Sequence, residues 1–259
     1  MNLSDNNVLL IYVSFFLFIL GTILGSFINC VASRIVDGRD WIRGKSICET
    51  CKHELGPLDL IPVFSYIFLK GKCRYCGTKI SPRYMLTELF LGICFVWCFL
   101  TRKTLDFTLV RDLALIVILL GLSLVDLDSF IIPDGFIIAG IINWLISVFF
   151  VSDKLEYIRS GLIGAFVISG TILGASLIMD KVLQKESLGG GDVKLLFMLG
   201  LYTGAFKGFF LLFVSCVIGL LFVILLKKDR IPFGPSISMA AFLILLYGQR
   251  FLEWYLNLF

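Results

Sequence analysis

Two acidic residues beside chain-breaking sequences are the best candidates for chemistry in this otherwise apolar chain. Asp192 follows three glycines at 189–191, and Asp126 lies 66 residues earlier, ahead of a break at Pro133-Asp134. Glycine lets the backbone turn sharply and approach a neighbouring group closely. An acid inside an apolar segment of membrane-spanning length is a candidate functional residue. We therefore predict that Asp126 and Asp192 act together as a catalytic pair.

Two neighbouring carboxyl groups can carry out peptide hydrolysis. When they share one proton, one carboxylate acts as a base toward water and the other acts as an acid. The water attacks the peptide carbonyl, and the proton passes to the leaving amine. Asp128 and Asp134 are the residues that could be confused with Asp126. The single histidine, His53, leaves no His-Glu-x-x-His zinc motif, and a Ser-His-Asp triad would have to use it.

A second constellation consists of two Cys-x-x-Cys pairs, Cys48 with Cys51 and Cys73 with Cys76. Two such pairs can present four thiolates to one tetrahedral zinc ion. We predict a structural zinc site, because a domain this small has little core of its own. A redox pair and His53 as a replacement ligand are the alternatives. The other four cysteines, at positions 30, 94, 98 and 216, are expected to be small buried apolar residues.

The elements that must position these residues are membrane helices. The chain is 58% hydrophobic and 16% charged, with a mean hydropathy of +0.96, which is far from the usage of soluble domains. About 20 apolar residues cross a bilayer. Eight segments qualify, although the sixth is short and seven spans are possible: 8–31, 84–101, 108–126, 135–151, 159–179, 193–205, 207–226 and 235–256. We therefore predict an all-α polytopic membrane protein of about eight helices.

The long connection between the first two spans defines the domain organisation. We predict a first helix at 1–33, a cysteine-rich zinc domain at 34–83 and a transmembrane peptidase domain at 84–259. The segment 34–83 carries 10 of the 23 lysines and arginines against 5 acids, which predicts that it is cytoplasmic. This basic excess orients the protein in the lipid bilayer, and we expect no nucleic-acid partner. Both acid motifs then lie on the cytoplasmic side.

These motifs resemble those of the bacterial type IV prepilin peptidases, which are membrane aspartyl proteases of the GxGD type. The resemblance extends from the first apolar segment to the last. The matching motifs are Gly25-Ser-Phe-Ile-Asn29, Arg34, the two cysteine pairs, Pro62-Val-Phe-Ser65-Tyr66, Leu69-Lys-Gly71-Lys-Cys73, Ile80-Ser81-Pro82-Arg83-Tyr84, Glu88, Asp126 to Pro133-Asp134, Glu186, Gly189-x-Gly191-Asp192, Lys194 and Phe233-Gly234-Pro235. Carried over by position, the resemblance implies Asp126 and Asp192 as the catalytic pair, with these supporting residues: Gly189, Gly191, Lys194 and Asp134.

The resemblance also implies a reaction and a location. Leaders of prepilins and pseudopilins would be cleaved at the cytoplasmic face of the bacterial cytoplasmic membrane, and the new N-terminus would be methylated from S-adenosylmethionine. The cysteine domain favours a bifunctional enzyme over peptidase-only relatives. A Rossmann-type glycine loop is absent from the sequence, so Arg34, Gly71 and the junction of the cysteine domain with the membrane are the candidate positions for S-adenosylmethionine. The sequence does not indicate an oligomeric state.

Two alternatives of other classes stay open. An ion-coupled transporter also uses intramembrane acids and broken helices, but near the midplane of the membrane. Both acid motifs map to one side here, which disfavours a transporter. A non-catalytic, zinc-bearing assembly factor is the other alternative.

Several further residues have two interpretations. Glu88 is either interfacial or a buried partner of Arg83 or Lys194. Lys194 either stabilises the charged form of Asp192 or anchors the cytoplasmic end of its helix. Gly25 and Asn29 line a cleft or serve close helix packing. Four acids at the ends of apolar segments are expected to be solvated: Asp106, Asp112, Asp153 and Asp180.

Overall fold

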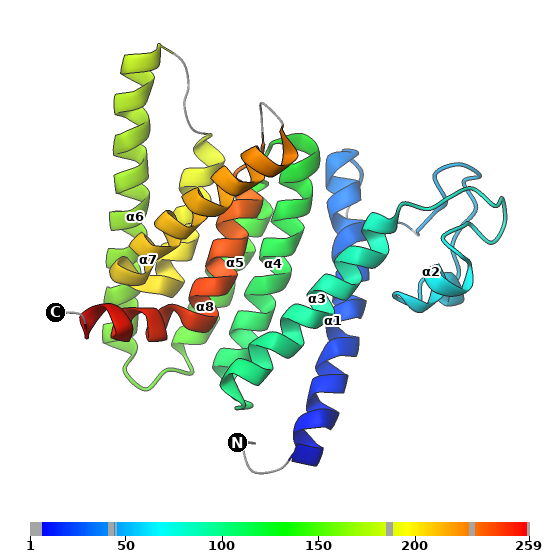
Figure 1. Ribbon diagram of the computed structural model, residues 1–259, viewed down its shortest axis with the longest axis horizontal. Coiled ribbons are helices and arrows are strands. Elements are labelled where there is room, and N and C mark those ends of the chain that lie inside the picture. The colour runs from blue at the N-terminus through cyan, green and yellow to red at the C-terminus, as the bar shows by residue number, and fades with distance from the viewer. Residues whose placement is uncertain (1–6, 41–43, 45, 185–188, 228–230, 258–259) are drawn as a thin grey trace. The chain divides into compact units, whose positions relative to one another are not determined.

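A computed structural model of the chain describes residues 7–40, 44, 46–184, 189–227 and 231–257. This part of the chain is almost wholly helical (Figure 1), as predicted. The elements are α1 (Asn7–Val36), the 3₁₀ helix η1 (Pro57–Asp59), α2 (Phe64–Phe68), α3 (Pro82–Arg102), α4 (Phe107–Ser129), α5 (Asp134–Val148), α6 (Lys154–Leu183), α7 (Gly190–Leu226) and α8 (Gly234–Leu256). They form two compact units, Met1–Gly121 and Leu122–Phe259, and α4 passes from one to the other.

Six of these helices are long and apolar enough to cross a membrane, within the part of the chain that the structure describes: α1, α3, α4, α6, α7 and α8. Many of their large apolar side chains are exposed, because a bilayer rather than water surrounds them. The chain is therefore a multi-pass membrane protein.

Seven of the eight apolar segments predicted from the sequence lie wholly in helices, and the other, 135–151, extends three residues past the end of α5. Two of them, 193–205 and 207–226, fall in the single element α7, which is interrupted at Gly204 with φ 67° and ψ −179°. Glycine adopts this backbone conformation readily, whereas other residues rarely do. Figure 1 shows the two halves of α7, yellow and then gold to orange, running in different directions. Since α5 has 15 residues, fewer than a full crossing needs, the number of spans stays a prediction.

In the first unit, α1 packs along α3 through small residues. A Cβ atom on Gly21 would lie 2.7 Å from the Gly92 Cα, and one on Gly25 would lie 2.8 Å from the Glu88 Cα. Small residues let membrane helices approach this closely. Asn29 donates hydrogen bonds across the same contact, to Thr87 and to a backbone carbonyl. Gly25 and Asn29 therefore serve helix packing.

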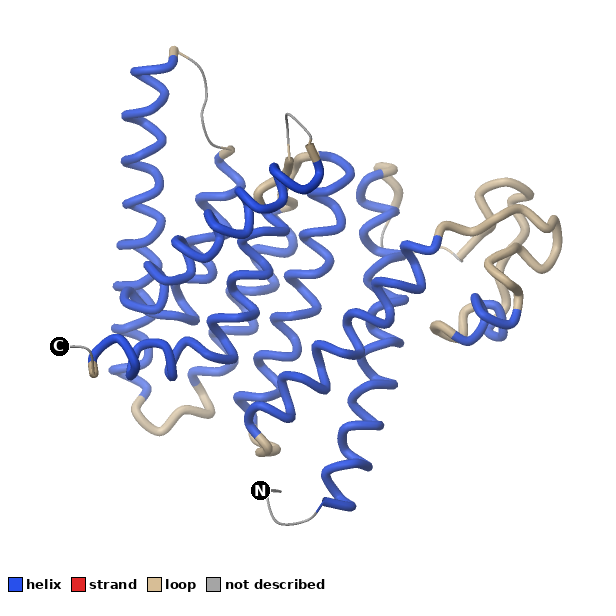
Figure 2. Tube along the Cα trace, viewed as in Figure 1, coloured by secondary structure: helices blue, strands red, loops and turns tan. Residues whose placement is uncertain are grey.

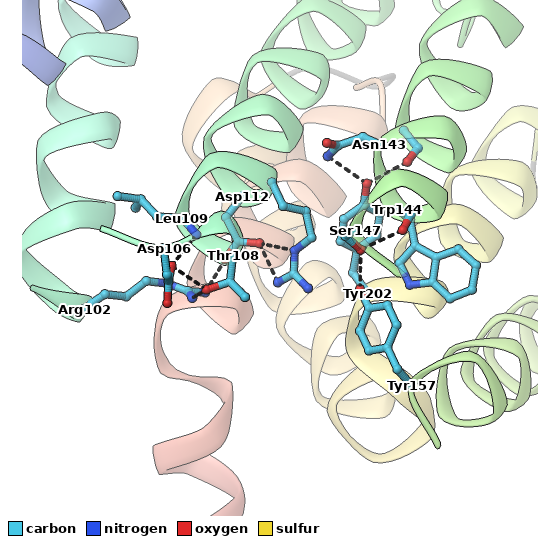
Figure 3. Close-up of polar contacts among 12 residues, drawn as sticks. Arg102, Asp106, Thr108, Leu109, Asp112, Asn143, Trp144, Ser147, Tyr157 and Tyr202 are labelled. Carbon is cyan, nitrogen blue, oxygen red and sulfur yellow. Dashed lines mark hydrogen bonds and ion pairs between the residues drawn. The ribbon is translucent and has the colours of Figure 1, made fainter. Parts of the chain in front are cut away.

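Asp112, at the start of α4, is fully buried, so the prediction that it is solvated is wrong. Its carboxylate forms ion pairs with Arg102 and with Arg111, the latter at 2.6 Å (Figure 3). A buried charge requires such partners. Asp106 caps the same helix, accepting a hydrogen bond of 2.9 Å from the Leu109 N–H, and it is exposed as predicted. Asp112 therefore ties the end of α3 to the start of α4, and Asp106 caps α4.

In the second unit, α7 packs against α5, α6 and α8. Small residues again permit the contact, since a Cβ atom on Gly200 would lie 2.6 Å from the Ala165 Cα. Figure 3 shows hydrogen bonds that join α5 to its neighbours. Tyr202 of α7 donates to the Gly140 carbonyl at 2.6 Å, and Ser147 contacts the Tyr157 hydroxyl at 2.9 Å. These bonds hold the short α5 in place.

The connection between α1 and α3 contains most of the loop structure of the first unit (Figure 2). Two isolated β-bridges, Ile47 with Glu54 and Lys72 with Lys79, are the β-structure in the described residues. Of the cysteines outside this connection, Cys94 and Cys98 are buried as predicted, whereas Cys216 is exposed on α7.

Candidate active site and metal centre

Asp126 lies in the last turn of α4 and is 4% exposed. Its Oδ2 atom accepts a hydrogen bond of 2.9 Å from the backbone N–H of Gly234, the first residue of α8. The N–H groups at a helix start lack partners within the helix and carry partial positive charge. A Cβ atom on Gly234 would lie 2.5 Å from the same carboxylate oxygen, so glycine is required for this approach. The start of α8 therefore fixes one oxygen of Asp126.

Asp192 lies in the first turn of α7, where its N–H donates to the Gly189 carbonyl at 3.1 Å. It is half-buried and within electrostatic reach of Asp126. Gly191, directly before Asp192, packs against the segment between α4 and α5. A Cβ atom on Gly191 would lie 3.0 Å from the Ile132 Cβ atom. This contact brings the two acid-bearing helices together.

The glycines act differently from the expectation of a sharp turn. Gly189, Gly190 and Gly191 have no positive φ angles, and Gly189 is extended with φ −70° and ψ 137°. A Cβ atom on Gly189 would make an ordinary contact of 3.7 Å with Asp192 Oδ2, and one on Gly190 would meet nothing within 4 Å, so the close packing of this segment is at Gly191. The matching residue Glu186 lies outside the described residues.

The remaining predicted site residues lie at the surface. The Lys194 ammonium forms an ion pair of 2.7 Å with Asp134 Oδ1, and both side chains are more than half exposed. This pair links the start of α7 to the start of α5. Asp128 is exposed, although it is two residues from the buried Asp126.

The four predicted zinc ligands lie in two turns of the same construction. In the first, the Cys48 N–H donates to the His53 carbonyl at 3.0 Å, and in the second the Cys73 N–H donates to the Thr78 carbonyl at 2.8 Å. Each turn is closed by one of the two β-bridges. Each also contains a residue with left-handed backbone, Lys52 or Gly77. The sequence spacing of the cysteines thus corresponds to two equivalent turns.

The sulfur atoms of Cys48, Cys51, Cys73 and Cys76 all lie within 4.8 Å of one another. Four thiolates at about 2.3 Å from a tetrahedral zinc ion would stand about 3.8 Å apart. The Cys48 and Cys76 sulfurs are 3.8 Å apart, so the donor set fits such an ion.

The thiols of this cluster influence one another. A hydrogen bond with Thr78 lowers the pKa of Cys76 to about 6. A hydrogen bond from the His53 backbone lowers the pKa of Cys51. Burial and the neighbouring thiols outweigh this effect and raise the pKa of Cys51 to about 11. A bound cation would favour the thiolate form of all four. The His53 ring packs against the tilted ring of Tyr75 at 3.6 Å between centroids and lies outside the cluster.

Three other residues of the first unit have structural contacts. Glu88 is buried and its Oε2 accepts a hydrogen bond of 2.7 Å from the Val63 N–H. Arg34 donates to the Gly44 carbonyl at 2.8 Å. Gly71 packs against the ring of Tyr66, since a Cβ atom there would lie 2.8 Å from the tyrosine hydroxyl.

Gly234 is the site residue that the sequence interpretation missed. The pair Gly234-Pro235 before an apolar run is a helix-start signal. It does not show which side chain lies at that start, because Asp126 is 108 residues away in the chain.

Comparison with known proteins identifies two family models in this chain. The Bacterial Peptidase A24 N-terminal domain matches residues 19–102, and the Type IV leader peptidase family matches residues 113–224. No solved structure matches the chain.

Curated relatives carry the name prepilin leader peptidase/N-methyltransferase. That of Myxococcus xanthus is 36% identical over 72% of this chain and 55% of its own length, so the match spans about half of that relative. That of Aeromonas salmonicida is 29% identical over 93% of this chain and 92% of its own length. That of Bacillus subtilis is 30% identical over 93% of this chain and 97% of its own length. The chain therefore belongs to the prepilin leader peptidase/N-methyltransferase family.

Proposed function

We propose that Asp126 and Asp192 are the catalytic carboxyl groups with which this chain cleaves prepilin leaders. The observation that carries the proposal is the burial of Asp126, whose Oδ2 is held by the Gly234 N–H at 2.9 Å while Asp192 lies within electrostatic reach. The contrast with the exposed Asp128 and Asp134 favours Asp126 over its neighbours.

In this mechanism the hydrogen bond from Gly234 leaves the other oxygen of Asp126 free to contact a water molecule. One carboxylate of the pair removes a proton from the water, which attacks the carbonyl carbon of the scissile peptide bond. The second carboxyl group donates its proton to the carbonyl oxygen. The tetrahedral intermediate collapses when the C–N bond breaks: the carboxyl group that took the proton from water gives it to the leaving amine, and a hydroxyl of the intermediate returns a proton to the other carboxylate. The half-buried Asp192 gives the substrate access to the pair.

Membership of the family gives the chain both a peptidase and an N-methyltransferase activity, with pilin-type substrates. This excludes the transporter and the non-catalytic assembly factor as the main function. We propose S-adenosylmethionine as the methyl donor, because it is the general biological donor for N-methylation. The structural contacts of Arg34 and Gly71 do not by themselves indicate where it binds.

We propose that the four cysteines hold one structural zinc ion. A closed four-thiolate site leaves no coordination position for substrate, so the ion would stabilise the fold and would not take part in catalysis. Each turn contributes two ligands, and neither turn forms a site alone.

We propose further that the protein lies in the bacterial cytoplasmic membrane with its active site facing the cytoplasm. The excess of basic residues in 34–83 supports this orientation. The domain boundaries 1–33, 34–83 and 84–259 are part of the same proposal.

Cleavage of a prepilin by the purified protein in detergent tests the assignment. Wild type is compared with Asp126→Asn and Asp192→Asn, and Asp128→Asn is the matched control at an exposed carboxylate. Mass spectrometry of the product reports leader loss and the addition of a methyl group. We expect both site variants to lose cleavage while the control retains it. Cleavage by folded Asp126→Asn or Asp192→Asn would refute the pair.

A further inference from the structure

The short helix α2 exposes its apolar side. Phe64, Ile67 and Phe68 follow the helical spacing i, i+3 and i+4, and all three are exposed, Phe68 to 79%. The more polar residues Ser65 and Tyr66 lie on the less exposed side, where the Tyr66 hydroxyl donates to a backbone carbonyl. This arrangement is the reverse of that in a helix packed on a domain core in water.

The exposed apolar surface extends into the preceding residues. Together we call the following residues the apolar loop face: Leu58, Leu60, Ile61, Phe64, Ile67 and Phe68. Several large apolar side chains exposed on one short segment are a sign of a contact with a partner or a membrane.

A single hydrogen bond fixes where this segment lies along α3. The Val63 N–H, directly before α2, donates to Glu88 Oε2 at 2.7 Å. Glu88 is the seventh residue of α3, which places it about 9 Å along the helix axis from Pro82 at about 1.5 Å per residue. Val63 has φ 63°, a conformation that β-branched residues rarely adopt, so the chain is constrained at this contact.

The surroundings at this depth are those of lipid. Leu86 and Phe90, two residues before and after Glu88, are both exposed and apolar on the side of the membrane-spanning α3 opposite Glu88. Figure 1 shows α2 to one side of the start of α3. The apolar loop face is therefore attached at a height along α3 where this helix also exposes apolar side chains.

Basic residues follow the apolar loop face. Lys70, Lys72 and Lys79 are exposed in the segment after α2. Lysines beside an inserted apolar face are suited to anionic phospholipid headgroups. Charge and apolarity thus indicate the same partner.

We propose that the apolar loop face inserts into the phospholipid bilayer at the boundary between headgroups and acyl chains, with the lysines against anionic headgroups. The four-cysteine domain then rests on the membrane surface. An interfacial segment reaches about 5–10 Å into the bilayer, which is comparable with the rise of about 9 Å along α3 from Pro82 to Glu88.

Photocrosslinking of the full-length protein in vesicles tests this proposal. p-Benzoylphenylalanine replaces Phe68 in protein reconstituted into phosphatidylethanolamine with phosphatidylglycerol. The same label at Ile93, exposed on α3, marks a lipid-facing position, and at Lys52, exposed in the first cysteine turn, it marks a charged loop position outside the proposed contact. We expect lipid adducts at Phe68 in a yield similar to that at Ile93, and none at Lys52. If the Phe68 variant fails to fold, the label at Ile67 serves the same purpose.

Each other outcome would overturn the proposal. Adducts from position 68 to a second copy of the chain would assign the face to a dimer, and adducts to an added prepilin would assign it to substrate. Absence of lipid adducts at both 67 and 68 in folded protein would exclude insertion. Vesicles of phosphatidylcholine alone, which lack anionic headgroups, test the contact of the lysines with such headgroups. In these vesicles we expect a lower yield of lipid adducts at position 68 and an unchanged yield at position 93. Equal yields at position 68 in both lipids would refute the headgroup contact.

Discussion

Replacing Gly234 with alanine should slow leader cleavage strongly while leaving methylation of a pre-cleaved substrate unchanged. The added Cβ atom would lie 2.5 Å from Asp126 Oδ2 and 3.2 Å from its Cγ, so the carboxylate and the start of α8 must separate. The hydrogen bond of 2.9 Å from the Gly234 N–H is then lost.

The size of the effect follows from that one bond. A hydrogen bond to a charged group contributes about 1.5–3 kcal/mol, which corresponds to about 10- to 150-fold in rate if the bond positions Asp126 in the transition state. Alanine is well tolerated in helices, so we expect α8 to form normally. The Michaelis constant should change little, because Gly234 contacts Asp126 and not the substrate in this proposal.

The assay measures kcat and KM for leader removal with the wild type, Gly234→Ala and the control Gly170→Ala. A Cβ atom on Gly170 of α6 meets nothing within 4 Å, so that variant reports the general effect of an added methyl group. Methylation of a synthetic peptide with a free N-terminus shows whether the protein is folded. Unchanged kcat in Gly234→Ala would refute the role of this bond. Equal loss of both activities would indicate misfolding instead of a local effect.

Three further predictions concern stability and the periphery of the site. Asp112→Asn should lower stability in detergent by about 3–5 kcal/mol, because Arg102 and Arg111 lose the charge of their buried partner, and thermal unfolding measures the loss. Cys76→Ser, or treatment with a zinc chelator, should release the metal and increase proteolysis of the connection between α1 and α3, as shown by elemental analysis and limited digestion. Lys194→Ala should lower the rate of leader cleavage by less than about fivefold, because an exposed ion pair contributes about 0–1 kcal/mol.

The opposite results are equally informative. An Asp112→Asn variant as stable as wild type would show that the buried charges do not depend on that carboxylate. Full zinc content after Cys76→Ser would exclude this thiol as a ligand. A loss of more than tenfold in Lys194→Ala would place the lysine in the catalytic mechanism.

The sequence predicts those parts of the structure that depend on local pattern. The spacing of Cys48, Cys51, Cys73 and Cys76 corresponds to two equivalent turns, because each turn is built within a few residues. The apolar segments predict the helices for the same reason. Long-range contacts were not predictable: the bond from Gly234 to Asp126 and that from Val63 to Glu88 join residues far apart in the chain. The burial of Asp112 was also missed, because its arginine partners depend on how α3 and α4 meet.

The two cysteine turns have a consequence for how the first unit assembles. The helices α1 and α3 pack together, although a long connection from Val36 to Pro82 separates them in sequence. Closing a flexible loop costs chain entropy that grows slowly with its length, by about 0.6 kcal/mol for each doubling. With a metal joining the two turns, the residues between Cys51 and Cys73 would be removed from that loop. The ion would therefore shorten the effective loop between α1 and α3 during membrane insertion. A shorter loop would favour pairing of α1 with α3 before the rest of the protein has folded.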